Sequence, residues 1–313
     1  MLAYTLRRIL AAIPVMGVVA LFVFLLLRLT PGDPAAIIAG DTATPAQLEA
    51  IRTSLGLDKP IPVQFATWIG QLAQGDLGTS LISKTPVTTL IGQRLGPTLS
   101  LALITMVLSI LIAVPMGVLA AWKHGTLIDS LVMALCVLGF SVPVFVIGYL
   151  LIQVFAIQLR WFPVQGFSSI VNGLGPFSQR ATLPAFTLAS IYVALIARMT
   201  RASLLDVLGE DYIRTARAKG VAERKVLFRH ALRNCAVPIL TVIGTGFALL
   251  ISGVVVTESV FNIPGLGRLI VDAVLARDYP VIQGLILLTS GIYVLINLLV
   301  DLSYSLLDPR IRY

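Results

Sequence analysis

The stretch Asp211-Tyr-Ile-Arg-Thr-Ala-Arg-Ala-Lys-Gly220 lies inside a polar segment, Arg198 to Arg233, that separates two long apolar runs. This segment carries nine Lys and Arg residues against four acidic ones. Basic loops that join membrane spans lie on the cytoplasmic side. Two or three positive charges would be enough to set that orientation. A segment this long and this basic therefore predicts a cytoplasmic docking surface as well as a topology signal.

Apolar residues within the segment recur at the three- and four-residue spacing of a helix. Gly220 interrupts the pattern, which then resumes. The sequence therefore predicts a helix–turn–helix hairpin within residues 198–234 that lies partly on the membrane surface. The residues that carry the spacing are Leu204, Leu205, Leu208, Tyr212, Ile213 and Ala216 before the break, and Val226, Leu227 and Ala231 after it.

The composition indicates a membrane protein. The chain has 313 residues, of which 57% are hydrophobic and 12% charged, whereas soluble domains carry roughly 25% charged residues. A spanning helix needs about 20 mostly apolar residues, and its backbone groups must be satisfied within the helix. We therefore predict an all-α integral membrane protein with six spans. The six runs are Ile9–Leu27, Pro97–Trp122, Ser130–Leu159, Ala181–Ala197, Cys235–Thr257 and Val281–Val300.

The distribution of positive charge predicts the orientation. Six spans place both termini on one side, together with the turn at Lys123 and the 198–233 loop. The sequences on that side hold 14 of the 23 Lys and Arg residues, so both termini are predicted to be cytoplasmic. The net charge of +8 is explained by this bias and does not indicate a nucleic-acid partner. The first apolar run is longer than a signal-peptide core, so it is interpreted as an uncleaved span.

The chain is predicted to divide into residues 1–29 with the first span, an extracytoplasmic segment 30–96, and a five-helix core 97–313. Thr44-Pro45-Ala46-Gln47 has the pattern of a capping box and starts a short helix, with Gly56 as its stop. Phe65, Trp68, Ile69 and Leu72 indicate a second helix that ends near Gly75. These helices could form a funnel, a lid or a receptor platform, or simply a structural cap.

No catalytic or metal-binding motif is found in the sequence. His-Glu-x-x-His, Gly-x-Ser-x-Gly and the phosphate-binding loop Gly-x-x-x-x-Gly-Lys-Ser/Thr are all absent. Cys136, Cys235, His124 and His230 lack ligand spacing and are interpreted as structural or surface residues.

A few residues in or beside the spans are candidates for the translocation pathway or a gate. An acidic residue at membrane depth is costly and is a functional candidate by default. For Glu258, near the outer end of the fifth span, a functional role and a structural role are equally supported. A structural role is favoured for Asp301, near the inner end of the sixth span. Ser141 and Pro143 can bend a helix that lines a cavity.

Several blocks together resemble the permeases of binding-protein-dependent ABC transporters, in the dipeptide, oligopeptide and nickel subfamily. The resemblance covers nearly the whole chain. The central loop resembles the ATPase-coupling loop of these permeases, and the other blocks resemble the exit from the first span, the segment before the sixth span and the tail. The blocks are Tyr212–Gly220, Phe228–Asn234 with Pro238, Arg28–Pro34, Glu258–Arg268, Arg277–Pro280 and Leu307–Arg312.

The chain departs from the general permease motif, which reads Glu-Ala-Ala, three residues, then Gly. Arg214-Thr215-Ala216 precedes Gly220 here, and Arg233 stands where the general motif has Pro. These changes are usual in the peptide branch. They leave open which side chain replaces the glutamate in contacting the ATPase.

The resemblance implies a transport subunit without catalytic residues or cofactors of its own, in a bacterial inner membrane. It implies a second permease, two ATPase subunits that bind ATP and magnesium, and an extracytoplasmic solute-binding protein. Short peptides are the implied solutes, with nickel chelates, glutathione or another small solute as alternatives. A channel or secondary carrier that does not use ATP is the alternative from a different class.

The resemblance also suggests how the subunit is driven. In this hypothesis the hairpin sits in a groove of the ATPase and moves as a lever when the ATPase dimer closes. Gly220 permits a turn that a side chain would obstruct. The expected coupling residues are Arg214, Thr215, Ala216, Arg217, Lys219, Gly220, Arg224 and Lys225.

Overall fold

A computed structural model of the chain describes residues 2–29, 35, 44–54 and 56–307. Four helices in this part of the chain are each long and apolar enough to cross a membrane. They are α1 (Leu2–Leu29), α5 (Val87–Trp122), α8 (Leu174–Leu208) and α15 (Tyr279–Leu307). Two bent helix pairs bring the number of spans to as many as six. The predicted all-α membrane architecture is confirmed.

The third predicted span is broken into two helices. Helix α6 (Leu127–Ser141) and helix α7 (Val144–Leu151), which continues through a π-helical turn at Ile152–Gln158, form a pair bent by 101°. Pro143 lies at the break, because proline lacks the N–H that a continuing helix needs and its ring clashes with the preceding turn. The sequence predicted that Ser141 and Pro143 can bend a helix at this position, and the observed bend is sharp enough to divide the span into two helices.

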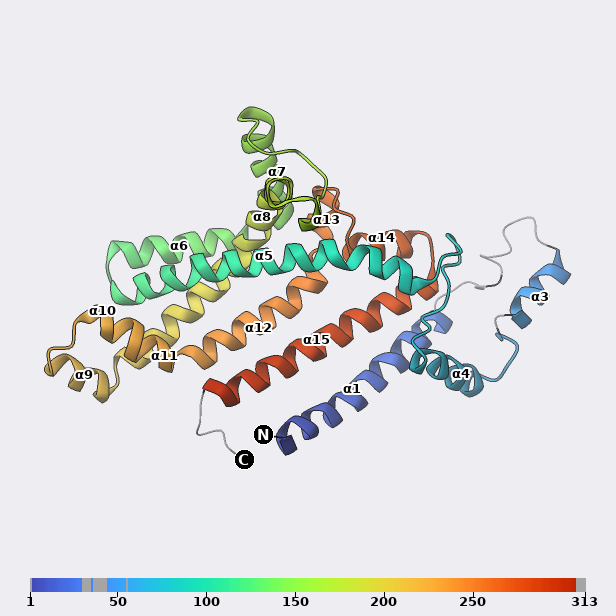
Figure 1. The fold of residues 1–313 in the computed structure, drawn as a ribbon, viewed down its shortest axis with the longest axis horizontal. Helices are drawn as coiled ribbons and strands as arrows, with labels where there is room; N and C mark the ends of the chain where they lie inside the picture. The colour runs from blue at the N-terminus through green and yellow to red at the C-terminus, as the bar shows by residue number, and fades with distance from the viewer. Residues whose placement is uncertain (1, 30–34, 36–43, 55, 308–313) are drawn as a thin grey trace.

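Helices α5 and α8 pack closely against each other at the centre of the molecule. A Cβ atom added at Gly117 on α5 would lie 2.6 Å from Cβ of Thr200 and 2.7 Å from the carbonyl oxygen of Ala197, both on α8. Small residues permit this approach, as is common between membrane helices. Helix α6 covers one side of this pair, and α12 (Ala236–Gly253), α15 and α1 follow one another on the other side (Figure 1).

The two short helices predicted between the first two spans are present as α3 (Pro45–Ser54) and α4 (Ile61–Ala73). The capping box is confirmed: the Thr44 N–H donates to Oε1 of Gln47 at 2.9 Å, and the Gln47 N–H donates to Oγ1 of Thr44 at 3.4 Å. Gly56 and Gly75 follow the helices with φ of +64° and +80°, the left-handed conformation of a C-terminal stop.

Two further short helices, α13 (Val255–Val260) and α14 (Leu266–Leu275), lie away from the central loop. The loop before α5 is joined to the segment between α14 and α15. The Ser80 hydroxyl and the Leu81 N–H both donate to the carboxylate of Asp278, the latter at 3.0 Å. Two blocks of the resemblance, Arg28–Pro34 and Leu307–Arg312, lie mostly outside the described residues, as do Arg310 and Arg312 of the charge count.

The start of α1, the end of α15 and the central loop lie toward the same end of the molecule (Figure 1). Nε of Arg8, near the start of α1, lies 3.1 Å from Oδ2 of Asp301, near the end of α15. This arrangement is what an even number of spans requires.

Candidate coupling hairpin and translocation residues

The central loop forms the predicted hairpin. Its first arm is α9 (Asp211–Ala218), and its second arm consists of α10 (Glu223–Lys225), a π-helical turn at Val226–Ala231 and α11 (Leu232–Asn234). The second arm then bends by 62° into α12. The helix–turn–helix prediction is confirmed for the two arms, with a short irregular second arm in place of a regular helix. The first arm is shorter than predicted, because Leu204, Leu205 and Leu208 belong to the end of α8.

One face of the hairpin packs against the ends of the spanning helices. Ile213, Val226 and Ala231 are fully buried. With Leu227 they form an apolar cluster whose other members come from α5, α8 and the start of α12. Burying a side chain of this size stabilises by about 1.5–3 kcal/mol, so the hairpin is held firmly to its helices. The other members are Val118, Ala121, Leu204, Cys235 and Ile239.

The turn between the arms depends on a left-handed glycine. Gly220 has a φ of +76°, and a Cβ atom added there would meet no atom of the described residues within 4 Å. The expectation that this turn needs glycine is confirmed by the left-handed backbone, although no neighbouring atom among the described residues would obstruct a side chain. The need for glycine comes from the backbone conformation, which costs roughly 1–2 kcal/mol for other residues.

Two side-chain contacts close the hairpin across the turn. Arg217 on the first arm donates to both carboxylate oxygens of Glu223 on the second, at 3.2 and 2.7 Å. These hydrogen bonds raise the pKa of the Arg217 guanidinium. Near the base of the hairpin, Nδ2 of Asn234 donates to the Tyr212 hydroxyl at 2.7 Å. The two arms therefore form one unit.

The opposite face of the hairpin is exposed and basic. The structure brings together all eight predicted coupling residues, of which Ala216 is half-buried and the others are exposed. Two aromatic residues that the prediction did not include, Tyr212 and Phe228, are 42% and 53% exposed on the same hairpin. Exposed aromatic and basic side chains are typical of protein-docking surfaces. Helical spacing could have indicated Phe228, because it lies outside the face that carries the buried Val226, Leu227 and Ala231.

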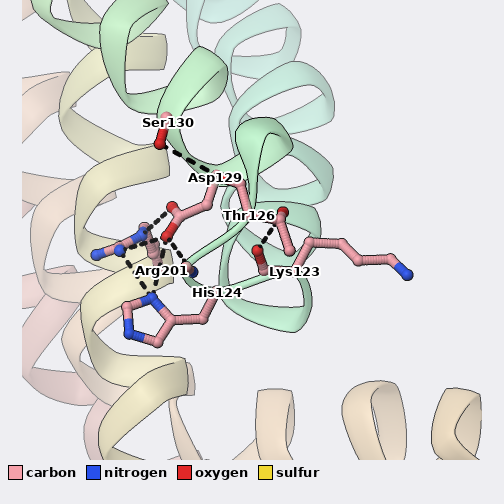
Figure 2. A network of polar contacts seen from close by, with 7 residues as sticks. Lys123, His124, Thr126, Asp129, Ser130 and Arg201 are labelled. Atoms are coloured by element: carbon pink, nitrogen blue, oxygen red, sulfur yellow. Dashed lines mark hydrogen bonds and ion pairs between the residues drawn. The ribbon is translucent and has the colours of Figure 1, made fainter.

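A charged cluster clamps the turn between α5 and α6 onto α8 (Figure 2). Arg201 on α8 donates through Nε to Oδ1 of Asp129 at 2.6 Å and through a terminal nitrogen to Oδ2 at 2.7 Å. The Gly125 N–H donates to Oδ2 at 3.1 Å, and Nδ1 of His124 lies 3.0 Å from the same oxygen. The Asp129 side chain is only 7% exposed. Such an arginine–carboxylate fork fixes geometry as well as charge.

This cluster was not predicted from the sequence. Asp129 was not singled out among the acids beside the spans, and Arg201 was counted only as a topology charge. The sequence did contain a sign of its importance. Asp129 stands in the first turn of an apolar helix, where the helix dipole stabilises an acidic side chain. His124, expected to be a surface residue, is exposed but also contacts Asp129.

Glu258 is completely buried at the other end of the molecule. The Thr98 hydroxyl of α5 donates to its Oε1 at 2.6 Å, and the Arg268 N–H at the start of α14 donates to its Oε2 at 2.9 Å. Thr98 itself accepts from the Leu266 N–H at 2.8 Å. The Glu258 carboxylate therefore caps α14 and joins it to α5 and α13. These contacts give Glu258 a structural role, which is one of the two roles that the sequence left open.

The four predicted pathway residues do not converge. Asp301 is engaged with Arg8 at the hairpin end of the molecule, whereas Glu258 caps α14 at the opposite end. Ser141 and Pro143 flank the α6–α7 bend, and α7 packs against α13, the helix that carries Glu258. Within the described ranges, no group of three His, Cys, Asp or Glu residues could hold a metal ion.

Two family models match the chain in succession. Residues 1–102 match the N-terminal part of binding-protein-dependent transport system membrane components. Residues 113–313 match the binding-protein-dependent transport system inner membrane component. This chain belongs to that family. It is therefore a multi-pass ABC transporter permease of the inner membrane, a class that works with ATPase subunits and a binding protein.

Curated relatives resemble the permease over its whole length. A probable peptide ABC transporter permease from Sinorhizobium fredii is 56% identical over 310 residues, 99% of each chain. A putative peptide transport system permease from Brucella abortus is 47% identical over the full length of both chains. A glutathione transport system permease from Escherichia coli is 46% identical, again over the full length of both chains.

A solved structure supports the fold of the permease. A chain of the MetNI methionine ABC transporter, crystallised in an inward-facing conformation, aligns with a TM-score of 0.58 at 17% identity. The alignment covers 71% of this permease and 97% of that chain. At this identity the likeness concerns the fold alone.

Proposed function

We propose that this permease, paired with a second permease subunit, forms the translocation path of an ATP-driven importer for short peptides. The relatives named as peptide permeases support this solute class, since they match the permease over nearly its whole length. The permease itself is proposed to catalyse no reaction and to bind no cofactor. ATP and magnesium are held by the two ATPase subunits.

The hairpin is proposed to be the contact with the ATPase. The observation that carries this is its two-sided construction: an inner face buried on α5, α8 and α12, and an outer face that is basic and partly aromatic. A rigidly attached surface of this kind can transmit a movement of the partner to the spanning helices. In this proposal the hairpin and both termini face the cytoplasm, where the ATPases are, and the segment 30–96 faces outward toward the binding protein.

Glutathione is a second candidate solute. The Escherichia coli relative named as a glutathione permease is 46% identical over the full length. Glutathione is itself a small peptide-like molecule, so one path could serve either solute. Nickel chelates remain an alternative within the subfamily. Solute choice in such importers rests largely with the binding protein, which is a separate chain.

Isolation of the native complex tests the proposal. The tagged permease is purified gently from its own membrane, and the proteins that accompany it are identified. A second permease with two ATPase subunits is expected. The complex, reconstituted in proteoliposomes with its binding protein, should then take up labelled di- and tripeptides only when ATP is present. An ATPase-free homo-oligomer would contradict the proposal and favour a channel or carrier.

A further inference from the structure

Helix α4 lies outside the spans but has the surface of a membrane-embedded element. Its thirteen residues, Ile61–Ala73, include no charged side chain, although Asp58 and Lys59 immediately precede the helix and Asp76 follows it. None of its residues is buried against the rest of the chain. A short surface helix in contact with water on one face normally carries charged residues on that face.

One side of α4 rests on the end of the first span. Phe65 and Trp68 of α4 contact Phe24 of α1, with ring centroids 5.0 and 5.6 Å apart. Phe24 lies in the last turn of the apolar stretch Leu6–Leu25. The contact therefore places α4 at the edge of the hydrocarbon layer, where tryptophan is enriched in membrane proteins.

The surface of α1 beside this contact carries an exposed apolar side chain. Leu21 lies three residues before Phe24, so the two side chains share one face of α1. Leu21 is 44% exposed within the spanning stretch. On α4 itself, Ile61 and Val63 are 54% and 46% exposed. Exposed apolar side chains are thus present both on the spanning helix beside the contact and at the start of α4.

We propose that α4 is an interfacial helix that inserts its uncharged surface into the outer-leaflet headgroup and acyl-chain boundary. Lipid is the occupant because α4 packs on the end of a spanning helix and lacks the charges that a water-exposed platform would carry. Amphipathic helices of this kind lie in the plane of the interface, with their apolar side buried in it. The helix anchors the segment before α5 to the bilayer, and it does so independently of the proposed solute.

Site-directed fluorescence in the intact transporter tests this placement. Cys136 and Cys235, both buried, are first replaced by alanine. Single cysteines are then introduced as Val63→Cys and, as the matched control, Lys59→Cys at the exposed residue just before the helix. Each is labelled with an environment-sensitive dye, and the assembled complex is reconstituted in vesicles of phosphatidylethanolamine and phosphatidylglycerol.

The proposal predicts blue-shifted emission at position 63, with quenching by headgroup- and shallow-chain spin-labelled lipids several-fold stronger than at position 59. Iodide in the buffer should quench position 59 more strongly. Equal iodide quenching at the two positions would show that α4 lies in water and would overturn the proposal. Protection of position 63 from both iodide and lipid quenchers would also overturn it, because the surface would then be covered by the partner permease or the binding protein.

Discussion

Arg201 and Asp129 join two helices across 72 residues of sequence through hydrogen bonds of 2.6 and 2.7 Å. Arg201 stands within two turns of the end of α8, and Leu204, one turn further on, belongs to the apolar cluster beneath the hairpin. The clamp therefore connects the α5–α6 turn to the same helix that carries the hairpin. A movement of the hairpin would therefore displace both α8 and the α5–α6 turn.

Removing one partner of this clamp should destabilise the permease. We expect Asp129→Asn or Arg201→Met to lower its thermal unfolding temperature in detergent. The cost should fall below the ~3–5 kcal/mol of a fully buried pair, because the Arg201 side chain is 22% exposed. The double variant Asp129→Leu/Arg201→Met should recover part of the loss. Arg198→Gln, at an exposed residue of the same helix, is the control. Equal unfolding temperatures in all variants would contradict a stabilising clamp.

Gly220→Val should uncouple ATP hydrolysis from uptake. The left-handed backbone at this turn disfavours a β-branched residue by roughly 1–2 kcal/mol, so the turn is distorted where the ATPase is proposed to bind. Gly75→Val is a matched control, because Gly75 has a φ of +80° and equally open surroundings at the end of α4. Uptake per ATP hydrolysed is the measurement. Equal uptake per ATP hydrolysed in the Gly220→Val and Gly75→Val variants would contradict the coupling role. Gly220→Asn should retain most of the activity, because asparagine tolerates the left-handed conformation.

Replacing a buried side chain of the hairpin should affect its stability, whereas replacing an exposed one should affect its binding to the ATPase. Ile213→Ala creates a cavity in the cluster that holds the hairpin and should cost about 2–5 kcal/mol, seen as faster proteolysis between Arg214 and Lys219. Phe228→Ala removes an exposed ring and should leave proteolysis unchanged. It should instead weaken co-purification of the ATPase. An ATPase yield unaffected by Phe228→Ala would argue against this ring as a docking residue.

Gly265→Ala should disrupt the cap of α14. A Cβ atom at Gly265 would overlap the carboxylate of Glu258. Displacing that carboxylate would break its hydrogen bonds with the Thr98 hydroxyl and the Arg268 N–H. We expect a lowered unfolding temperature, partly restored in Gly265→Ala/Glu258→Ala. Gly175→Ala, where a Cβ atom meets open space in the first turn of α8, is the control and should have little effect.

Local sequence patterns predicted much of this structure. Runs of apolar residues located the spanning helices, and Gly56, Gly75 and Gly220 correctly marked the ends of short helices. The helix boundaries were less accurate. Helix α5 begins at Val87, ten residues before the predicted Pro97, because a helix continues past its apolar stretch wherever its backbone hydrogen bonds can still form.

The partners of the charged residues could not be predicted in this way. Glu258 and Asp301 were both noticed as acids near spans, but nothing in the sequence indicates that one caps α14 and the other contacts Arg8. Asp129 was overlooked because its significance lies in Arg201, on a different helix. An acid beside a span can only be interpreted once its neighbours in space are known.

The sequence alone determined the class of protein, the positions of its apolar segments and the presence of a basic hairpin, because hydropathy and helical periodicity are properties of neighbouring residues. Only the tertiary structure decided the 101° bend at Pro143, the clamp of Asp129 by Arg201 and the placement of α4 on Phe24. Each of these depends on which helices pack together. Packing brings into contact residues far apart in the chain, and no local pattern records those contacts.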